Sequence, residues 1–219
     1  ISAHYADEFT ESHAKAMVVR DHLGAALPTA GVGCAFSRPM LDRLEDLRRR
    51  EGLAGPFASD CLTEDYELGL LITRLGGRGR FLRLRDSQGE LVATRSYFPS
   101  GLEEAVRQKT RWVHGIALQG WDRLGWAGGL STRWMLARDR KGLFTAAVAM
   151  LAYAAALLVL LQLMLRGVLS RAADVTLPPM LGADSMLPGF LLFNALLLGW
   201  RLLLRAGFTA HAYGWVEGA

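Results

Sequence analysis

The sequence predicts an α/β domain followed by a transmembrane helical hairpin. Residues 1–141 carry 39 of the 46 formally charged side chains, which leaves seven for residues 142–219. In the charged part, segments with apolar residues at helical spacing are mixed with segments that alternate apolar and polar residues, a pattern typical of α/β domains. Residues 143–165 contain no charged side chain, and a buried core helix rarely runs so long without a polar face.

The composition excludes several classes of protein. With 219 residues, of which 51% are hydrophobic and 21% charged, the chain is not a disordered tail, a collagen-like fibre or a disulfide scaffold. Its net charge of +4 comes from 22 Arg and three Lys against 21 acidic residues. We expect the one dense basic cluster, Arg48, Arg49 and Arg50, on a solvated helix face. No recognition motif accompanies it, so no nucleic-acid partner is expected. Cys34 and Cys61 lack CxxC spacing and are expected to be reduced thiols in a cytosolic portion.

Three helices are expected in the first part of the chain. Residues 11–24 have helical spacing and a stop signal at Gly24, and Pro39 starts a second helix that runs to about Glu51. A third helix is predicted after Thr63, a good N-cap residue followed by two acidic residues that suit a first turn. The apolar residues of its buried stripe are Leu68, Leu71, Ile72 and Leu75.

Two strands and a long amphipathic region are predicted next. Residues 79–85 and 90–98 alternate well enough for strands, with Asp86 to Gly89 as their turn. At Ser100 the pattern returns to helix, because Ser100 and Glu103 have the spacing of a capping box. The amphipathic stretch that follows is rich in tryptophan. Its expected anchors at the lipid headgroups are Trp121, Trp126 and Trp134.

Two transmembrane spans are predicted, at about residues 143–165 and 186–204. At about 1.5 Å per residue the first is roughly 34 Å long, enough to cross a hydrocarbon core of about 30 Å. The second contains Asn194 and Arg201, and a re-entrant or interfacial helix is its alternative. The positive-inside rule then places the large polar domain and the C-terminus in the cytoplasm. The flanking charges are Arg133, Arg138, Arg140 and Lys141 before the first span, Arg166, Arg171, Asp174 and Asp184 in the expected loop, and Arg201 and Arg205 at the end of the second span.

Two short strings carry candidate chemistry. The string TED occupies residues 63–65 at a predicted helix start, and the string QKTRW occupies residues 108–112, some forty residues later. A helix N-terminus favours an ionised carboxylate, whereas burial raises its pKa, and the balance for Asp65 stays open. Taken alone, Glu64 and Asp65 would be interpreted as residues that cap a helix.

Together, in this order and beside a membrane span, the strings resemble the TED and QxxRW motifs of processive family 2 glycosyltransferases, the membrane synthases of cellulose, hyaluronan and related polysaccharides. Wider strings, including AGVGCAFSR, LTEDYELGL and RQKTRWVHGIALQGW, are similar to the glycosyltransferase portion of the bacteriophage N4 adsorption protein B family. The resemblance covers about residues 1–145 by motifs and the rest by hydropathy. It implies the C-terminal half of a GT-A domain on the cytoplasmic face of a bacterial inner membrane.

The resemblance also implies roles for single residues. Asp65 would be the catalytic base, positioned by Thr63 and Glu64. Arg111 would neutralise the departing pyrophosphate, and Gln108 would hold a phosphate or sugar oxygen. The indole of Trp112 would stack on a sugar ring of the acceptor, although an interfacial anchor is its alternative.

The segment from Gly31 to Cys34 matches a small-residue stretch that the family places near the acceptor, and a plain turn is its alternative. Gly33 and Cys34 are therefore expected to contact substrate, whereas Cys34 as a thiol nucleophile has no neighbouring base in sequence. The expected division is an acceptor-side GT-A part at 1–106, interface helices with the QxxRW motif at 107–141, and the hairpin with a cytoplasmic tail at 142–219.

One family feature is missing. No DxD string occurs in the sequence, so the ligands of the Mg²⁺ or Mn²⁺ that the family implies are expected upstream, in a longer parent, and this piece alone is expected to be inactive. The implied partners are a nucleotide-sugar donor, a polysaccharide acceptor and the lipid bilayer, with cyclic-di-GMP regulation and an outer-membrane partner as further expectations for the parent. The alternative is a catalytically silent membrane scaffold or receptor that keeps the fold.

Overall fold

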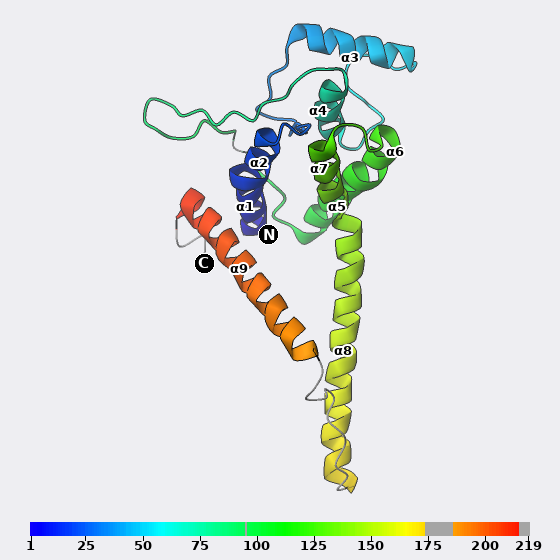
Figure 1. The fold of residues 1–219 in the computed structure, drawn as a ribbon, viewed down its shortest axis with the longest axis vertical. Helices are drawn as coiled ribbons and strands as arrows, with labels where there is room; N and C mark the ends of the chain where they lie inside the picture. Colours follow the sequence, from blue (N-terminus) through cyan, green and yellow to red (C-terminus); the bar gives the residue numbers. More distant parts are fainter. Residues whose placement is uncertain (95, 174–185, 215–219) are drawn as a thin grey trace. The chain divides into compact units, whose positions relative to one another are not determined.

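The computed structural model of the chain describes residues 1–94, 96–173 and 186–214 (Figure 1). These residues fall into two compact units. The first unit contains residues 1–142 and the end of the chain from residue 208, and the second contains the described part of residues 143–207. The helices, with η for π-helical turns, are α1 (Ser2–Glu11), η1 (Ser12–Ala16), α2 (Met17–His22), α3 (Arg38–Arg50), α4 (Glu64–Arg74), α5 (Leu102–Val113), η2 (His114–Gln119), α6 (Gly120–Leu124), α7 (Leu130–Arg140), α8 (Gly142–Ala173) and α9 (Leu187–Tyr213).

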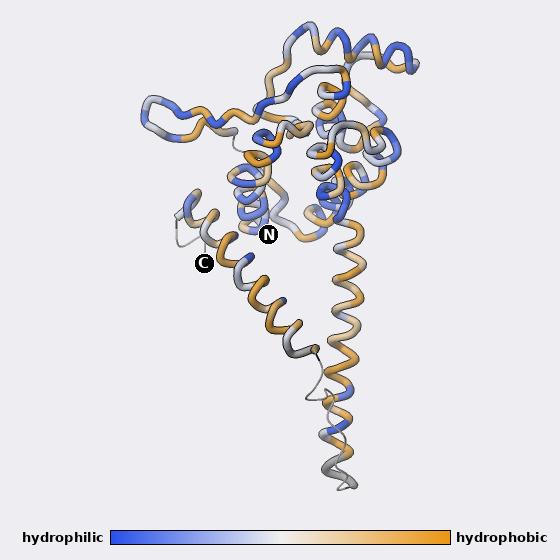
Figure 2. Tube along the Cα trace, in the orientation of Figure 1, coloured by the Kyte–Doolittle hydropathy of each residue, from blue (hydrophilic) through white to orange (hydrophobic). Residues whose placement is uncertain are grey.

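Helices α8 and α9 are long and apolar enough to cross a membrane. Their candidate spans are Gly142–Leu169 and Gly189–Tyr213, and Figure 2 shows apolar residues along most of both helices. Both predicted apolar helices are therefore present, and both are longer than expected. Helix α8 continues to Ala173, so the first residues of the predicted loop are helical. The expected loop residues Asp174 and Asp184 lie outside the described residues.

The first helical segment begins earlier than predicted. The backbone is helical from Ser2 to His22, with a π-helical turn in the middle, although the sequence indicated a start near residue 11. The early turns are stabilised by a distant partner, because the ring of Tyr5 is buried and stacks on Phe98 with 4.8 Å between centroids. Gly24 ends the segment as expected, with a φ of +62° that other residues rarely adopt.

Helix α4 lies at the centre of the core of the first unit. Its residues 66–71 are all buried, and they pack with side chains from α3, α6 and α7. The backbone of residues 27–29 crosses α4 at Gly69, where a Cβ atom would collide with it. Helices α3 and α4 have close to the predicted bounds. The buried members of the core cluster are Ala26, Leu44, Tyr66, Leu68, Leu70, Leu71, Leu124 and Leu136.

The two predicted strands do not form. In the described part of residues 79–85 and 90–98, the structure holds an isolated antiparallel bridge between Arg85 and Leu91 and no strand. The predicted turn between them is present, since the Asp86 carboxylate accepts the amides of Gln88 and Glu90 at 2.8 and 3.0 Å. Most apolar side chains of the alternating stretches are exposed, namely Leu82, Leu84, Leu91, Val92 and Tyr97, whereas Phe81 and Phe98 are half-buried. Without a surface that buries one whole side, a strand gains little stability. The regular secondary structure of the described residues is helical, so the expected α/β, GT-A architecture is not confirmed.

The predicted capping box is also wrong. Gly101, with extended backbone angles, is the N-cap residue of α5, and the helix has no side-chain cap. The box required Ser100 at this position. Because the helix starts one residue later, Glu104 takes the place expected of Glu103, and its carboxylate folds back over Gly101.

Arg140, at the end of α7, is folded between two tryptophans. Its guanidinium carbon lies 4.5 Å from the ring centroid of Trp126 and 5.5 Å from that of Trp121, and Nη2 donates to the carbonyl of Gly120 at 3.0 Å. Only 2% of the residue is exposed, and burial lowers the pKa of its guanidinium. A charge expected to flank the membrane span is therefore part of the folded domain.

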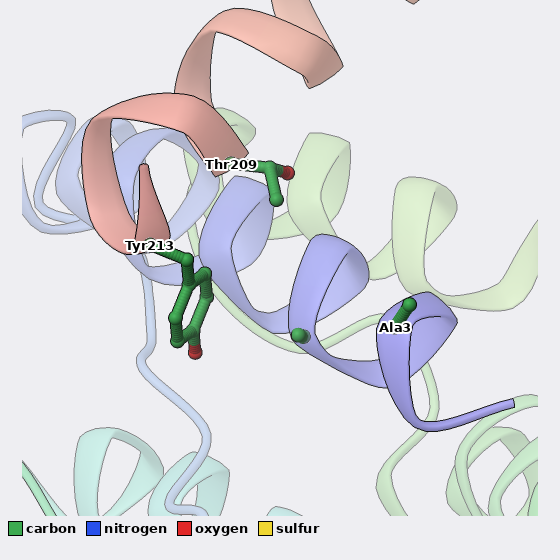
Figure 3. Close-up of a pocket in the computed structure, with 4 residues that line it drawn as sticks. Ala3, Thr209 and Tyr213 are labelled. Carbon is green, nitrogen blue, oxygen red and sulfur yellow. The ribbon is translucent and has the colours of Figure 1, made fainter. Parts of the chain in front are cut away.

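The last turn of α9 belongs to the first unit and contacts α1. The Thr209 hydroxyl donates to Asp7 Oδ1 at 3.0 Å. A pocket of about 300 Å³ lies here, lined by Ala3, Ala6, Thr209 and Tyr213 (Figure 3). Its lining has no charged side chain and none of the predicted site residues.

Leu44, on α3, tests the core. It is fully buried, so Leu44→Ala leaves a cavity and should lower the free energy of unfolding by about 2–5 kcal/mol. The matched control is Leu130→Ala, because Leu130 is 86% exposed. Urea unfolding of the chain in detergent micelles, followed by tryptophan fluorescence, measures both. Equal losses in the two variants would contradict the packing of α3 on α4.

Candidate active site

The TED string begins helix α4, as predicted, and its aspartate is fixed by two hydrogen bonds. Thr63 is the N-cap residue, and Glu64 and Asp65 stand in the first turn. Asp65 Oδ1 accepts the amide of Tyr66 at 2.7 Å, and the hydroxyl of Thr29 donates to the carbonyl oxygen of Asp65 at 2.6 Å. Both the side chain and the backbone of Asp65 are therefore held in place.

The two sequence strings lie on neighbouring elements of the fold. Thr63 does not cap α4 with its hydroxyl, because that atom is packed against η2, where a Cβ at Gly115 would lie 2.5 Å from it. The amide group of Gln119, one turn further along, accepts the backbone N–H of Leu62 at 2.9 Å and donates to the carbonyl of Asp60 at 3.0 Å. The turn before Asp65 is thus bound to the helix that follows the QKTRW string.

Asp65 has a raised pKa. Burial of the carboxyl is the main cause and the charge of Glu64 adds to it, whereas the amide of Tyr66 and the positive charge of Arg111 act in the opposite direction. Burial therefore outweighs the helix N-terminus, which settles the balance that the sequence left open. A carboxylate with a raised pKa is a stronger base, and this is the property that a general base needs.

A glycine loop covers the Asp65 carboxyl. Gly31 has a φ of +70°, and a Cβ on it would lie 3.1 Å from Asp65 Oδ2. Gly33 faces another residue, since a Cβ there would lie 3.3 Å from Thr94. Cys34 is exposed and free, as expected of a reduced thiol, and its Sγ lies 3.4 Å from the carbonyl oxygen of Val32. The structure therefore brings Gly31, rather than Gly33 or Cys34, against the Asp65 carboxyl.

Two predicted residues of α5 bring polar groups to this region. Arg111 is exposed, and its charge acts on the Asp65 carboxyl. Gln108 lies three residues earlier, and side chains three apart share one side of a helix. Its Oε1 atom is buried and accepts no hydrogen bond from the described residues. The structure thus links the Asp65 carboxyl to the charge of Arg111, while the position of Gln108 in the site stays a prediction.

Trp112 has aromatic partners within the protein. Its half-buried ring meets Tyr5, Phe9 and Phe98 edge to face, with centroids 6.1, 6.1 and 6.4 Å away. The ammonium of Lys109 lies 5.5 Å from its centroid. These contacts tie α5 to α1, and stacking of Trp112 on a sugar stays a prediction.

Glu67, buried below the TED string, was not singled out from the sequence. Its two oxygens pair with Arg48 Nη2 at 2.8 Å and Arg123 Nε at 2.9 Å, and Arg123 also pairs with Asp60 at 2.7 Å. Arg48 is only 2% exposed, so its expected place on a solvated face is wrong, although Arg49 is exposed. One sequence feature could have predicted this network: Glu67 is an acidic residue within the apolar stretch that follows TED.

No metal site is evident in the part of the chain that the structure describes. Its His, Cys, Asp and Glu side chains form no group of three or more that could hold a metal ion. The residues near Asp65 therefore do not fit a divalent metal, and no chemical step below is assigned to one.

The raised pKa of Asp65 predicts how its removal affects stability. A raised folded-state pKa stabilises the fold below the ordinary carboxyl pKa of about 4, and this contribution is lost as the pH rises through the folded-state pKa. Asp65→Asn should therefore raise the melting temperature of the chain at pH 7, and the difference should vanish below about pH 4. Thermal unfolding in detergent across this pH range measures it.

The matched control is Glu64→Gln, in the same turn but exposed. It should slightly lower the melting temperature at pH 7, because a negative charge at a helix N-terminus is stabilising. A lower melting temperature for Asp65→Asn at pH 7 would show that Asp65 serves mainly to cap α4.

Comparisons with known proteins identify the family to which the chain belongs. Residues 1–169 match the family described as "Glycosyl transferase family group 2". The chain is 36% identical over 177 residues to "Bacteriophage adsorption protein B" of Escherichia coli strain K12 and to "Bacteriophage N4 adsorption protein B" of Escherichia coli O157:H7. Each match covers 74% of this chain and 23% of the relative. No solved structure gives a significant match.

The chain thus spans about a quarter of the length of the curated relatives that it matches. The family match covers the helices that carry the TED and QKTRW strings and most of α8. The chain belongs to glycosyl transferase family group 2, close to the bacteriophage N4 adsorption protein B family.

Proposed function

We propose that the chain is the acceptor side of an inverting glycosyltransferase, which transfers a sugar from a nucleotide-diphosphate donor to a growing polysaccharide. The observation that carries the proposal is the Asp65 carboxyl. It is fixed at the start of α4, covered by the Gly31 loop, raised in pKa by burial, and within the influence of Arg111. A residue with these properties is suited to proton abstraction rather than to capping alone.

The proposed step is a single displacement. The Asp65 carboxylate takes the proton from an acceptor hydroxyl while the hydroxyl oxygen forms a bond to the anomeric carbon of the donor. The bond from that carbon to the phosphate oxygen breaks, and the electron pair leaves with the nucleoside diphosphate. Because attack and departure occur on opposite faces of the sugar, the configuration at the anomeric carbon inverts.

The other predicted residues have supporting roles in the proposal. Arg111, exposed near Asp65, would neutralise charge on the leaving diphosphate through charge-assisted hydrogen bonds. Gln108, three residues before Arg111 on α5, would hold a phosphate or sugar oxygen. Gly33 and Cys34, exposed beside the Gly31 loop, would contact the acceptor through backbone groups, and Trp112 would line its path.

The proposal places the enzyme in a bacterial inner membrane, with the charged unit in the cytoplasm. Two helices are apolar enough to span a bilayer, and the last turn of the second contacts α1 of the charged unit. This contact supports a hairpin whose two ends lie on the same side. Because the relatives are much longer, donor binding, the expected Mg²⁺ or Mn²⁺, cyclic-di-GMP regulation and an outer-membrane partner are proposed for a longer parent protein.

The names of the relatives favour a second candidate function. Both are described as bacteriophage adsorption proteins, and a membrane scaffold that serves adsorption could keep this fold without catalysis. A scaffold has no need for a half-buried carboxyl with a raised pKa, and Asp65 is such a group. The activity of the parent decides between the two candidates.

Asp65→Asn in the full-length parent tests the proposed base. Sugar incorporation in membrane vesicles should fall by about 10²-fold or more, since general-base catalysis typically contributes this much. In the wild type, incorporation should fall as the pH drops through the raised pKa of Asp65, because only the ionised carboxylate accepts a proton. Asp122→Asn, an exposed position on α6, is the matched control with unchanged incorporation. Wild-type incorporation by Asp65→Asn would remove Asp65 as the base, and a wild type inactive with every donor would favour the scaffold.

Gly31→Ala tests the loop over the carboxyl. The added methyl group would lie 3.1 Å from Asp65 Oδ2 at a φ that alanine rarely adopts, so we expect incorporation to fall about tenfold or more. Gly24→Ala causes the same backbone strain, because Gly24 has a φ of +62°, but the added Cβ would have open space around it. Both variants should lose similar stability, measured by thermal unfolding, and only Gly31→Ala should lose activity. A matching loss of activity in Gly24→Ala would show that backbone strain, rather than proximity to Asp65, is responsible.

A further inference from the structure

We propose that Asp139, on the last turn of α7, is a positioning residue that holds Asp65 in place through Tyr66 and Arg20. Nothing in the TED and QKTRW strings points to Asp139, which lies 74 positions after Asp65 in the sequence. The proposal rests on the proposed function, because it assigns the support of the same base.

The first route from Asp139 to the base runs through Tyr66, the next residue after Asp65. The Tyr66 hydroxyl donates to Asp139 Oδ2 at 2.8 Å, and its ring is 5% exposed. The ring also packs on the start of α6, since a Cβ at Gly120 would lie 3.5 Å from Tyr66 Cε1. The backbone N–H of the same residue donates to Asp65 Oδ1. Fixing the Tyr66 side chain therefore fixes the donor that orients the Asp65 carboxyl.

The second route runs through Arg20, at the end of the first helical segment. Arg20 Nη1 lies 3.0 and 2.8 Å from the two oxygens of Asp139, and Nε donates to the carbonyl of Ala26 at 2.5 Å. The segment that starts at Ala26 crosses α4 and brings the hydroxyl of Thr29 to the carbonyl oxygen of Asp65 at 2.6 Å. The Asp65 backbone is thus supported from Asp139 as well.

Asp139 has no free oxygen for chemistry of its own. Both carboxylate oxygens accept from Arg20, and one also accepts from Tyr66. Its side chain is 20% exposed and that of Arg20 is 5% exposed, so water competes little for these bonds. Asp139 also lies three positions before the start of α8. Its contacts therefore connect the site to the end of the helix that leads into the first membrane span.

The experiment uses the full-length parent in membrane vesicles and three variants: Tyr66→Phe, Asp139→Asn and the double variant. Each single variant should lower kcat by about ten- to a hundredfold with an unchanged KM for donor, because a small displacement of a catalytic group has effects of this size. The losses of the two single variants should not add in full in the double variant, since Tyr66→Phe removes, and Asp139→Asn weakens, the hydrogen bond between these two residues. Tyr97→Phe and Asp122→Asn, at exposed positions, are the matched controls with unchanged kcat.

The pH profile separates positioning from loss of folded protein. If Asp65 is released from its place, its carboxyl becomes hydrated, and the acid limb of kcat should move to lower pH. Glu64 and Arg111, the charged groups that act on Asp65, are unchanged in these variants. A lower content of folded protein would scale the whole profile without moving the limb, and that result would overturn the proposal. Tyr66→Phe decides the matter if Asp139→Asn folds poorly, because it keeps the Asp139–Arg20 pair.

The remaining outcomes separate this proposal from the proposed function. If the wild type transfers sugar and Asp65→Asn does not, while Tyr66→Phe and Asp139→Asn retain the wild-type kcat, the positioning role is overturned and the base assignment stands. If the wild type transfers no sugar from any donor, both proposals fall.

Discussion

Burial of the first two turns of α4 is the constraint on which the rest of the first unit depends. Residues 66–71 are enclosed by α3, α6, α7 and the crossing backbone of residues 27–29. Because neighbouring elements surround this helix, its position and the direction of its N-terminal turn are fixed. The carboxyl of Asp65 is therefore fixed by the core itself, and its surroundings are dry enough to raise its pKa.

Enclosure of this kind requires every polar group in it to find a partner, because an unpaired buried charge is strongly destabilising. Glu67 is paired by two arginines from different helices, and Tyr66 reaches Asp139, which is paired with Arg20. These networks tie α3, α6 and α7 to one helix. They give the core a single arrangement that apolar packing alone specifies less strictly.

The sequence predicted the parts of the structure that depend on local signals. Pro39 and the acidic turn after Thr63 set the starts of α3 and α4, Gly24 ended the first helical segment, and uncharged runs marked α8 and α9. The resemblance pairs the two strings in one site, and in the fold the positive charge of Arg111 acts on the Asp65 carboxyl.

The errors occur where a distant partner decides the outcome. Arg48 belongs to a charged cluster in sequence, yet it is buried because it forms an ion pair with the buried Glu67. Tyr5 extends the first helix because Phe98 covers it. Residues 79–92 alternate like strands, but most of their apolar side chains are exposed and no surface buries them. Asp139 and Arg20 are 119 positions apart, so no local pattern could pair them. The contacts of Asp139 with Tyr66 and Arg20 could not be predicted from the sequence for the same reason.

The π-helical turn η2 changes the angular positions of side chains between α5 and α6. A π turn holds one residue more than the corresponding α turn, so the sides of the helix before and after it are offset by about 100°. The charge of Arg111, before the π turn, acts on Asp65, and Gln119, at the end of the π turn, accepts the backbone N–H of Leu62. A helical wheel drawn through residues 102–124 with constant pitch would misplace one of the two. Deleting a single residue here would restore regular α-helical winding. It would rotate α6, with Trp121 and Arg123, by about 100° and move Arg123 away from Asp60, with which it pairs.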